Sequence, residues 1–232
     1  MDASGISTAI LSITVPGLDF GDLQEVARQA READGVELFA NSRGVYLGEP
    51  ASEPLFAELN RRRAVVFIHP NQLPGPKVPG LKYVAADILL DTTRAATLLV
   101  TSGFMARYPN MSVILSHAGG YIPYQAVRIC RASAPSAAYP GAAAADMVAD
   151  MRRYYFDTTL SGNEYTLKGL LAFANASRIT FGSDFLFGNA SLMDASTKGL
   201  DAFFGGGQKT LDETDGVPGG TWNVQVVLRE MH

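Results

Sequence analysis

Short hydrophobic runs alternate along the chain with longer stretches rich in helix-forming residues. The densest apolar run, residues 64–68, is largely β-branched and predicts a buried strand. Residues 111–115 predict a second clear strand, and shorter runs predict strands at residues 9–13, 36–39, 154–157 and 178–181. The intervening stretches predict helices at residues 23–33, 54–63, 87–107, 121–132, 143–152, 167–174 and 192–204.

Strands that alternate with helices indicate βα units, and therefore an α/β fold built on a parallel sheet. A closed TIM barrel needs eight strands and typically about 250 residues. The chain has 232 residues and six predicted strands. It is slightly short for a full barrel and long for a minimal doubly wound sheet.

Composition narrows the class of protein. Hydrophobic residues make up 47% of the chain and charged residues 18%, so it can bury a sizeable core and is not intrinsically disordered. The net charge of −4 gives no electrostatic reason to expect nucleic acid or an anionic membrane as a partner. No stretch approaches the roughly 18 consecutive apolar residues that a membrane span needs.

The single cysteine, Cys130, cannot form an internal disulfide, which favours a reducing compartment. The first residues lack the basic region of a secretory signal. We therefore expect a cytoplasmic protein with one globular domain.

Reactive side chains follow three of the predicted strands. His69 follows the run 64–68, His117 follows the run 111–115, and Asp184 follows the run 178–181. In parallel α/β folds, functional groups collect at the edge where the strands end. Neutral imidazoles with a carboxylate suit Zn²⁺ or a related divalent ion, and the same groups suit proton transfer.

Structural explanations remain open for each of these residues taken alone. A histidine at a strand end is often a buried residue bonded to a backbone carbonyl. Asp184 could cap the following helix, and the two glycines at 119–120 could form only a tight turn. The third histidine, His232, lies near the chain end, far from these motifs.

Four motifs together resemble the amidohydrolase-related metal-dependent decarboxylases, the group that includes aminocarboxymuconate-semialdehyde decarboxylase. They are Phe-Ile-His-Pro at residues 67–70, Ile-Leu-Ser-His-Ala-Gly-Gly at 114–120, Tyr-Phe-Asp-Thr at 155–158 and Thr-Phe-Gly-Ser-Asp at 180–184. Asp-Thr-Thr-Arg at residues 91–94, before a long helix, looks most like the 6-methylsalicylate decarboxylase branch. The resemblance covers residues 7–204.

This resemblance implies a distorted TIM barrel with one divalent metal, which we expect to be zinc, with manganese as the alternative. His69 would match a metal-ligand histidine, His117 the catalytic histidine, and Asp184 the aspartate that binds metal and handles a proton. Arg94 would match an arginine that attracts a substrate carboxylate, although a salt bridge within the helix explains it equally well.

The chain also departs from the family pattern. The His-x-His pair of the family's first strand, which supplies two further ligands, is absent from this sequence. A helix and a strand that the family has between residues 20 and 23 are also lacking. We therefore expect an incomplete barrel of about six strands over residues 1–205, a weakened metal site, and a divergent, flexible tail over residues 206–232.

The resemblance implies non-oxidative decarboxylation of a small aromatic or enol carboxylate. Hydrolysis of a lactone or amide by a metal-bound water is the alternative within the wider superfamily. A non-catalytic, degenerate family member is a third hypothesis. We expect a small aromatic carboxylate as substrate and a homo-oligomer, since missing strands would expose edges and apolar surface.

Overall fold

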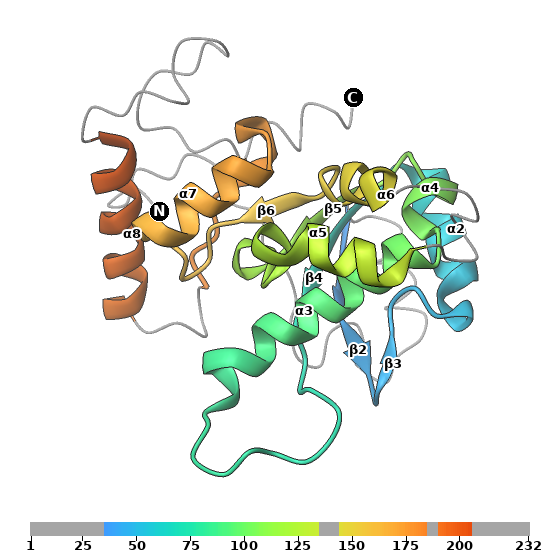
Figure 1. Cartoon of the computed structure of the whole chain (residues 1–232), viewed down its shortest axis with the longest axis horizontal. Helices are drawn as coiled ribbons and strands as arrows, with labels where there is room; N and C mark the ends of the chain where they lie inside the picture. The colour runs from blue at the N-terminus through green and yellow to red at the C-terminus, as the bar shows by residue number, and fades with distance from the viewer. Residues whose placement is uncertain (1–34, 135–143, 185–189, 206–232) are drawn as a thin grey trace.

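The computed structural model describes residues 35–134, 144–184 and 190–205 (Figure 1). Its centre is a five-stranded sheet in the order β1-β4-β5-β6-β7, and every neighbouring pair of strands is parallel. The strands are β1 (Gly35–Phe39), β4 (Val65–His69), β5 (Ser112–Leu115), β6 (Tyr155–Asp157) and β7 (Ile179–Thr180). The sheet order follows the chain order, as expected for successive βα units.

The incomplete barrel expected from the sequence is confirmed for the described residues. Within them the sheet does not close, because β1 and β7 each pair with one neighbour and not with each other. The strands predicted at 36–39, 64–68, 111–115 and 154–157 are present within about one residue at each end, and the one at 178–181 is shorter. The strand predicted at 9–13 and the helix at 23–33 lie outside the described residues.

A short hairpin was missed by the sequence analysis. β2 (Asn41–Ser42) and β3 (Val45–Tyr46) pair antiparallel directly after β1. The turn residues Arg43 and Gly44 both have positive φ, 53° and 86°. Two such residues match the twist of a tight hairpin.

Seven α-helices are described. They are α2 (Glu53–Arg62), α3 (Tyr83–Thr101), α4 (Phe104–Arg107), α5 (Ile122–Ser133), α6 (Ala144–Met151), α7 (Glu164–Phe173) and α8 (Ala190–Gly205). Three 3₁₀ turns accompany them: η2 (Pro50–Ser52), η3 (His117–Gly119) and η4 (Ala176–Arg178). None of the described helices is long and apolar enough to cross a membrane.

The single helix predicted over residues 87–107 is wrong in two respects. The structure starts α3 four residues earlier, at Tyr83, and ends it at Thr101 before the separate turn α4. Gly103 has a φ of 80°, in the left-handed region that glycine adopts without a Cβ penalty, and this breaks the helix.

Both faces of the sheet carry apolar side chains, and they form two separate clusters. Val66, Ile68, Val113 and Leu115 belong to the large cluster shared with the helices. The alternate residues Val65, Phe67, Ile114 and Tyr155 pack together on the opposite, inner face. Because side chains alternate along a strand, the residues at the strand ends continue this inner face towards the site.

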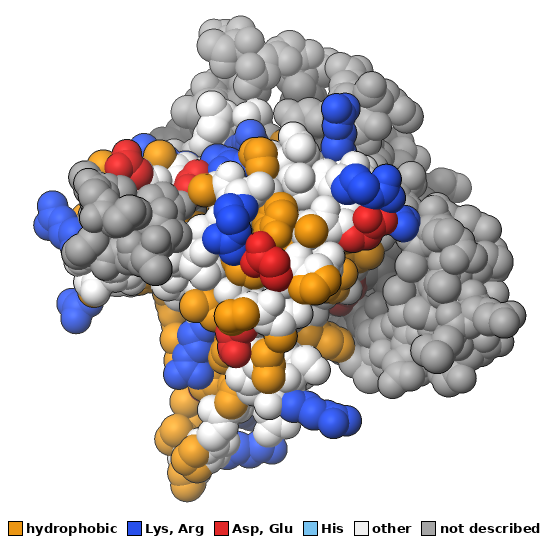
Figure 2. Space-filling view, turned by 90° about the vertical axis from the view of Figure 1, so that its right-hand side faces the viewer, with side chains coloured by type: hydrophobic (Ala, Val, Ile, Leu, Met, Phe, Trp, Pro, Cys, Tyr) orange, Lys and Arg blue, Asp and Glu red, His pale blue; other side chains and the backbone are white. Residues whose placement is uncertain are grey.

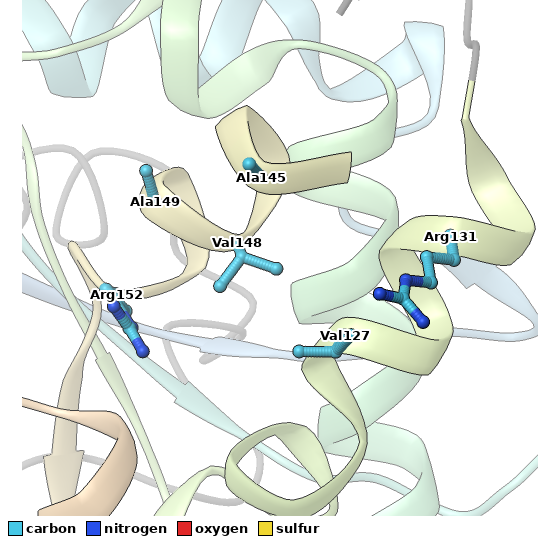
Figure 3. Close-up of a pocket in the computed structure, with 6 residues that line it drawn as sticks. All are labelled: Val127, Arg131, Ala145, Val148, Ala149 and Arg152. Atoms are coloured by element: carbon cyan, nitrogen blue, oxygen red, sulfur yellow. The ribbon is translucent and has the colours of Figure 1, made fainter. Parts of the chain in front are cut away.

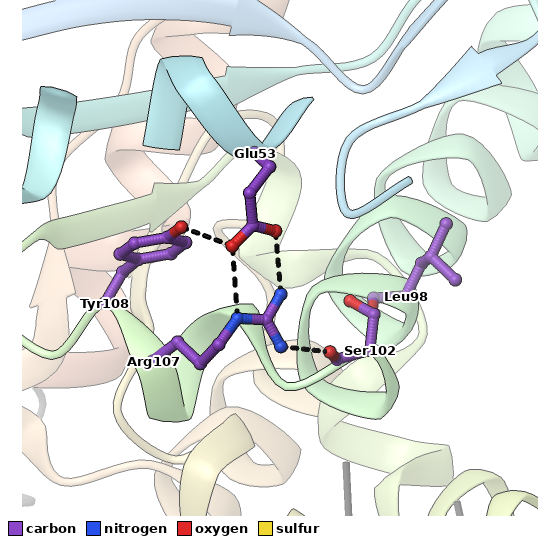
Figure 4. A network of polar contacts seen from close by, with 5 residues as sticks. All are labelled: Glu53, Leu98, Ser102, Arg107 and Tyr108. Carbon is purple, nitrogen blue, oxygen red and sulfur yellow. Dashed lines mark hydrogen bonds and ion pairs between the residues drawn. The ribbon is translucent and has the colours of Figure 1, made fainter. Parts of the chain in front are cut away.

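A surface network ties the start of α2 to the end of α4 (Figure 4). The Glu53 carboxylate accepts hydrogen bonds from the Tyr108 hydroxyl and from Arg107, whose Nη2 lies 2.9 Å from Oε2. Arg107 also donates to the carbonyl of Ser102 at 2.8 Å. The Tyr108 and Arg107 bonds hold the pKa of Glu53 below its usual value. Because Tyr108 precedes β5, this network lies at the end of the strands opposite to His69 and serves the fold.

Apolar side chains are exposed on the segment that joins β4 to α3. Figure 2 shows apolar side chains gathered at the lower, projecting end of the molecule. The large exposed apolar residues are Val78 and Leu81 on this segment and Tyr83 and Val84 at the start of α3, of which Val78 is 58% exposed.

Candidate active site at the carboxyl edge of the sheet

The predicted site residues lie at the carboxyl ends of parallel strands. His69 is the last residue of β4, His117 lies two residues after β5, and Asp184 lies four residues after β7. The structure brings His69 and His117 together, with their ring centroids 5.9 Å apart and the rings inclined by 57°. Asp184 is close enough to His117 to act on its charge.

Burial lowers the pKa of both histidines and so favours their neutral form. Burial lowers the pKa of His69, against the opposing effect of the Glu37 carboxylate. Burial likewise lowers the pKa of His117, with Asp184 opposing. The Nδ1 of His69 lies 2.8 Å from the Pro70 carbonyl oxygen, so Nδ1 carries the proton and donates it. The lone pair then sits on Nε2, as a metal ligand or a base requires.

His117 lies in a strained turn. The φ angles of His117 and Ala118 are both 54°, in the left-handed region that residues with a side chain rarely adopt. Gly120 follows with a φ of 62°, and a Cβ there would lie 2.3 Å from the Leu89 carbonyl oxygen. The motif at residues 114–120 therefore places the histidine by backbone geometry, and the glycines form more than a tight turn.

Asp157, at the end of β6, holds this turn in place. Its Oδ1 accepts the backbone N–H of His117 at 2.7 Å and that of Thr159 at 3.1 Å. Its Oδ2 accepts the Thr159 hydroxyl at 2.6 Å, and the Ala118 N–H also donates to this carboxylate. Burial raises the pKa of Asp157, against the lowering effect of these bonds.

Asp157 belongs to one of the four sequence motifs, but no role was predicted for it. It ends a buried strand, as His69 does, so the rule that found the histidines could have found it as well. Gly182 leaves room for it, because a Cβ there would lie 2.6 Å from Asp157 Oδ2.

Asp184 combines an unusual backbone with a partly buried carboxyl group. Its φ is 60°, which again indicates strain at the site. Burial raises the pKa of Asp184, the nearby His117 lowers it, and Asp157 adds to the increase. A raised pKa keeps a fraction of the carboxyl group protonated nearer to neutral pH, as a proton donor needs.

Arg94 lies apart from this group. It is exposed on α3, and its Nη1 lies 3.4 Å from the Tyr46 hydroxyl. Among the described residues, no hydrogen bond or ion pair joins it to His69, His117 or Asp184. Its role in attracting a substrate carboxylate therefore stays a prediction.

A buried carboxylate near Arg94 organises the loop after His69. Asp91 accepts hydrogen bonds from the Asn41 amide at 2.9 Å, the Tyr46 hydroxyl at 2.6 Å and the Asn71 N–H at 2.8 Å. Burial, assisted by Asp91, raises the pKa of Tyr46 to about 12. Sequence analysis missed this link, which attaches α3 and the hairpin to the chain two residues beyond His69.

Unsatisfied buried polar atoms gather around His69. In the described residues these atoms are both carboxylate oxygens of Glu37, Oγ of Ser116 and Nδ1 of His117. Glu37 lies on β1 opposite Phe67, on the same face as His69, and Ser116 follows β5 with its N–H bonded to the Ile68 carbonyl. Buried polar groups are normally bonded, so a concentration of unbonded ones indicates a place where a ligand supplies the partners.

The donor types suit a divalent cation, although the described residues do not preassemble a full ligand set. Imidazole nitrogen and carboxylate oxygen are ligands for zinc and manganese. No three His, Cys, Asp or Glu side chains in the described ranges stand close enough together to hold an ion as placed. The unbonded Glu37 carboxylate fits a cation, with water or substrate completing its coordination.

A separate groove of about 480 Å³ lies between α5 and α6 (Figure 3). Its lining is Val127, Arg131, Ala145, Val148, Ala149 and Arg152. It offers two arginines but no acid or base among these residues, and it lies on the helical layer. We therefore place the chemistry at the sheet edge.

The open parallel sheet, with histidines and carboxylates at its carboxyl edge, has the architecture of an incomplete (β/α) barrel. The amidohydrolase family profile matches residues 10–213, and the chain belongs to this family. It is 42% identical over 171 residues to 6-methylsalicylic acid decarboxylase from Penicillium expansum. This alignment covers 69% of this chain and 51% of that protein.

Two further relatives agree with this placement. The 2-amino-3-carboxymuconate-6-semialdehyde decarboxylase of Dictyostelium discoideum is 28% identical over 176 residues, covering 71% of this chain and 47% of that protein. The structure of 5-carboxyvanillate decarboxylase from Novosphingobium aromaticivorans superimposes with a TM-score of 0.67 at 20% identity. The superposition covers 87% of this chain and 72% of that one, which was solved with manganese and 4-hydroxy-3-methoxy-5-nitrobenzoic acid. The latter likeness concerns the fold. The chain spans about half the length of the curated relatives it matches.

Proposed function

We propose that the protein catalyses non-oxidative decarboxylation of a small aromatic or enol carboxylate of the 6-methylsalicylate kind. The observation that supports this most is the pairing of His69 with His117, ring centroids 5.9 Å apart, with Asp184 acting on His117. The likeness to the decarboxylase from Penicillium expansum supports the substrate class.

Two residues, Asp184 and His117, carry the proposed chemistry. Asp184 delivers a proton to the ring carbon that bears the carboxylate. The bond between that carbon and the carboxylate then breaks, its electron pair restores the aromatic ring, and CO₂ leaves. Solvent returns the proton to Asp184. His117 orients and polarises the substrate, and its neutral imidazole suits that role.

His69 and Asp184 are the proposed ligands of a divalent metal, zinc or manganese. When bound, such an ion neutralises and positions the substrate carboxylate and its neighbouring hydroxyl. Arg94 stays the proposed attractor of the substrate carboxylate.

Product analysis tests the proposed reaction against hydrolysis. Purified protein is incubated with 2-hydroxybenzoates, including 6-methylsalicylate, and separately with aromatic lactones, with Mn²⁺ or Zn²⁺ present. Release of CO₂ with formation of the phenol supports decarboxylation. Formation of ring-opened acid from the lactones supports hydrolysis instead, and the absence of any product supports a non-catalytic protein.

The metal site is expected to be weak, and this is our first prediction. A catalytic zinc site usually has three protein ligands and a water, whereas the described residues assemble no such group. Calorimetric titration of metal-free protein with Zn²⁺ should therefore give a dissociation constant weaker than about 1 μM. A tighter, one-to-one site that disappears in His69→Ala would contradict the prediction.

A homo-oligomer and a cytoplasmic location complete the proposal. The exposed apolar segment from Val78 to Val84 supports an oligomer, because apolar patches of this kind mark contact surfaces. Cys130, the one cysteine of the chain, is buried, and burial raises the pKa of its thiol. A buried, unpaired thiol suits a reducing compartment.

A further inference from the structure

Glu37 carries a buried carboxylate that has no hydrogen-bond partner among the described residues. Both of its carboxylate oxygens are shielded from solvent, and neither accepts a hydrogen bond. The ion pairs of the described residues join other side chains, on or beside the helices, and none includes Glu37. An ionised carboxylate in such a place is costly unless a cation or hydrogen-bond donors face it.

The sheet register places Glu37 beside His69. Phe39 pairs with His69 and Glu37 pairs with Phe67, so the side chains of Glu37 and His69 project from the same face of adjacent strands. The inner cluster of Val65, Phe67, Ile114 and Tyr155 lies on this face. The register therefore makes His69 a polar neighbour of Glu37 on the adjacent strand.

Each histidine has a carboxylate beside it. Glu37 has the largest effect on His69 among the charged groups, with a further effect from Asp157, and Asp184 acts on His117. Three carboxylates, those of Glu37, Asp157 and Asp184, thus act on two histidines whose pKa values burial lowers. An anionic substrate would be repelled from such a site unless a cation lay between them.

We propose that Glu37 is an oxygen ligand of a hard divalent cation, shared with His69 on the neighbouring strand. The proposal rests on the proposed function only in placing the cation at the same sheet edge. A mixed oxygen and nitrogen donor pair suits Mn²⁺, and water and the substrate's oxygens fill the remaining positions. Glu37 thus adds an oxygen ligand to the proposed pair of His69 and Asp184, and Asp184 also lies beside His117, where it can transfer a proton.

Mn²⁺ binding by two variants tests this proposal without measuring activity. Metal-free protein is titrated with MnCl₂, and free Mn²⁺ is followed by its electron paramagnetic resonance signal. Glu37→Gln should weaken binding about tenfold or more, because a neutral amide replaces a charged ligand. Glu164→Gln is the matched control, since Glu164 is exposed and pairs with Lys168 on α7. It should bind as the parent does.

Thermal unfolding gives a second readout. Mn²⁺ should raise the Tm of the parent and of Glu164→Gln, and should raise that of Glu37→Gln much less at the same concentration. Circular dichroism verifies that each variant is folded, and Glu37→Met replaces Glu37→Gln if the latter is not. Equal Mn²⁺ affinity in the parent and the folded Glu37 variant would overturn the proposal, as would an absence of Mn²⁺ binding by the parent at millimolar concentration.

The outcomes separate this proposal from the proposed function. CO₂ release by the parent, with Mn²⁺ affinity unchanged in Glu37→Gln, would refute the ligand while decarboxylation stands. Mn²⁺ binding that depends on Glu37, without CO₂ release from any 2-hydroxybenzoate, would support the ligand and refute decarboxylation.

Discussion

Replacing Asp184 by asparagine is expected to lower the rate constant of CO₂ release by about 10²–10⁴-fold, the usual contribution of a positioned proton donor. The amide cannot deliver a proton to the ring carbon, although it keeps the size of the side chain. KM should change much less than kcat, because the lost interaction is made chiefly in the transition state. Single-turnover CO₂ release from 6-methylsalicylate with saturating metal measures the effect.

Asp194→Asn is the control for this experiment. Asp194 lies on α8, where it is exposed and pairs with Lys198 at 2.7 Å. Its replacement should leave CO₂ release within about twofold, since surface ion pairs contribute little. Activity of Asp184→Asn within the same range would show that Asp184 is not the proton donor.

The second large effect is expected at Asp157, on stability. Asp157→Ala removes the acceptor for the buried N–H groups of His117, Ala118 and Thr159. Each unsatisfied buried donor costs about 1–3 kcal/mol, so the free energy of unfolding should fall by about 3–5 kcal/mol. Domains of this size have about 5–15 kcal/mol in total, which makes the loss severe.

Asp157→Asn separates the hydrogen bonds from the volume of the side chain. Its carbonyl oxygen can still accept from His117 and Thr159, while its amide can donate to the Thr159 hydroxyl oxygen. Urea unfolding should therefore show a smaller loss than in Asp157→Ala. Equal losses in the two variants would mean that these acceptor bonds do not hold the turn.

The prediction of the fold succeeded where structure follows from local pattern. The strand from Val65 to His69 is a β-branched run that lies inside the described sheet, between β1 and β5. The predicted long helix failed at Gly103, because a single left-handed glycine outweighs the apolar periodicity on both sides of it. The hairpin from Asn41 to Tyr46 was missed, since two-residue strands are too short to show alternation.

The candidate site was also predicted only in part. His69 and His117 were found because each closely follows a recognisable strand, and parallel strands end at one edge. The same reasoning did not find the bond between Asp157 and the His117 N–H, which joins residues 40 positions apart. Arg94 was predicted to bind the substrate because of its motif, whereas in the described part of the chain it donates a hydrogen bond to Tyr46, on the hairpin that was missed.

The amino-acid sequence by itself determined the order of the strands and the reactive residues that end them. Hydrophobic periodicity and glycine positions determine secondary structure over a few residues, so their effect can be predicted directly from the sequence. Only the tertiary structure decided which histidines have a pKa lowered by burial, which polar groups form hydrogen bonds, and which described polar atoms form none. Burial of His117, the four donors to Asp157 and the isolation of Glu37 all depend on side chains brought from other strands. Solvation and hydrogen bonding depend on which side chains pack around a group, and those side chains come from residues that are distant in the sequence.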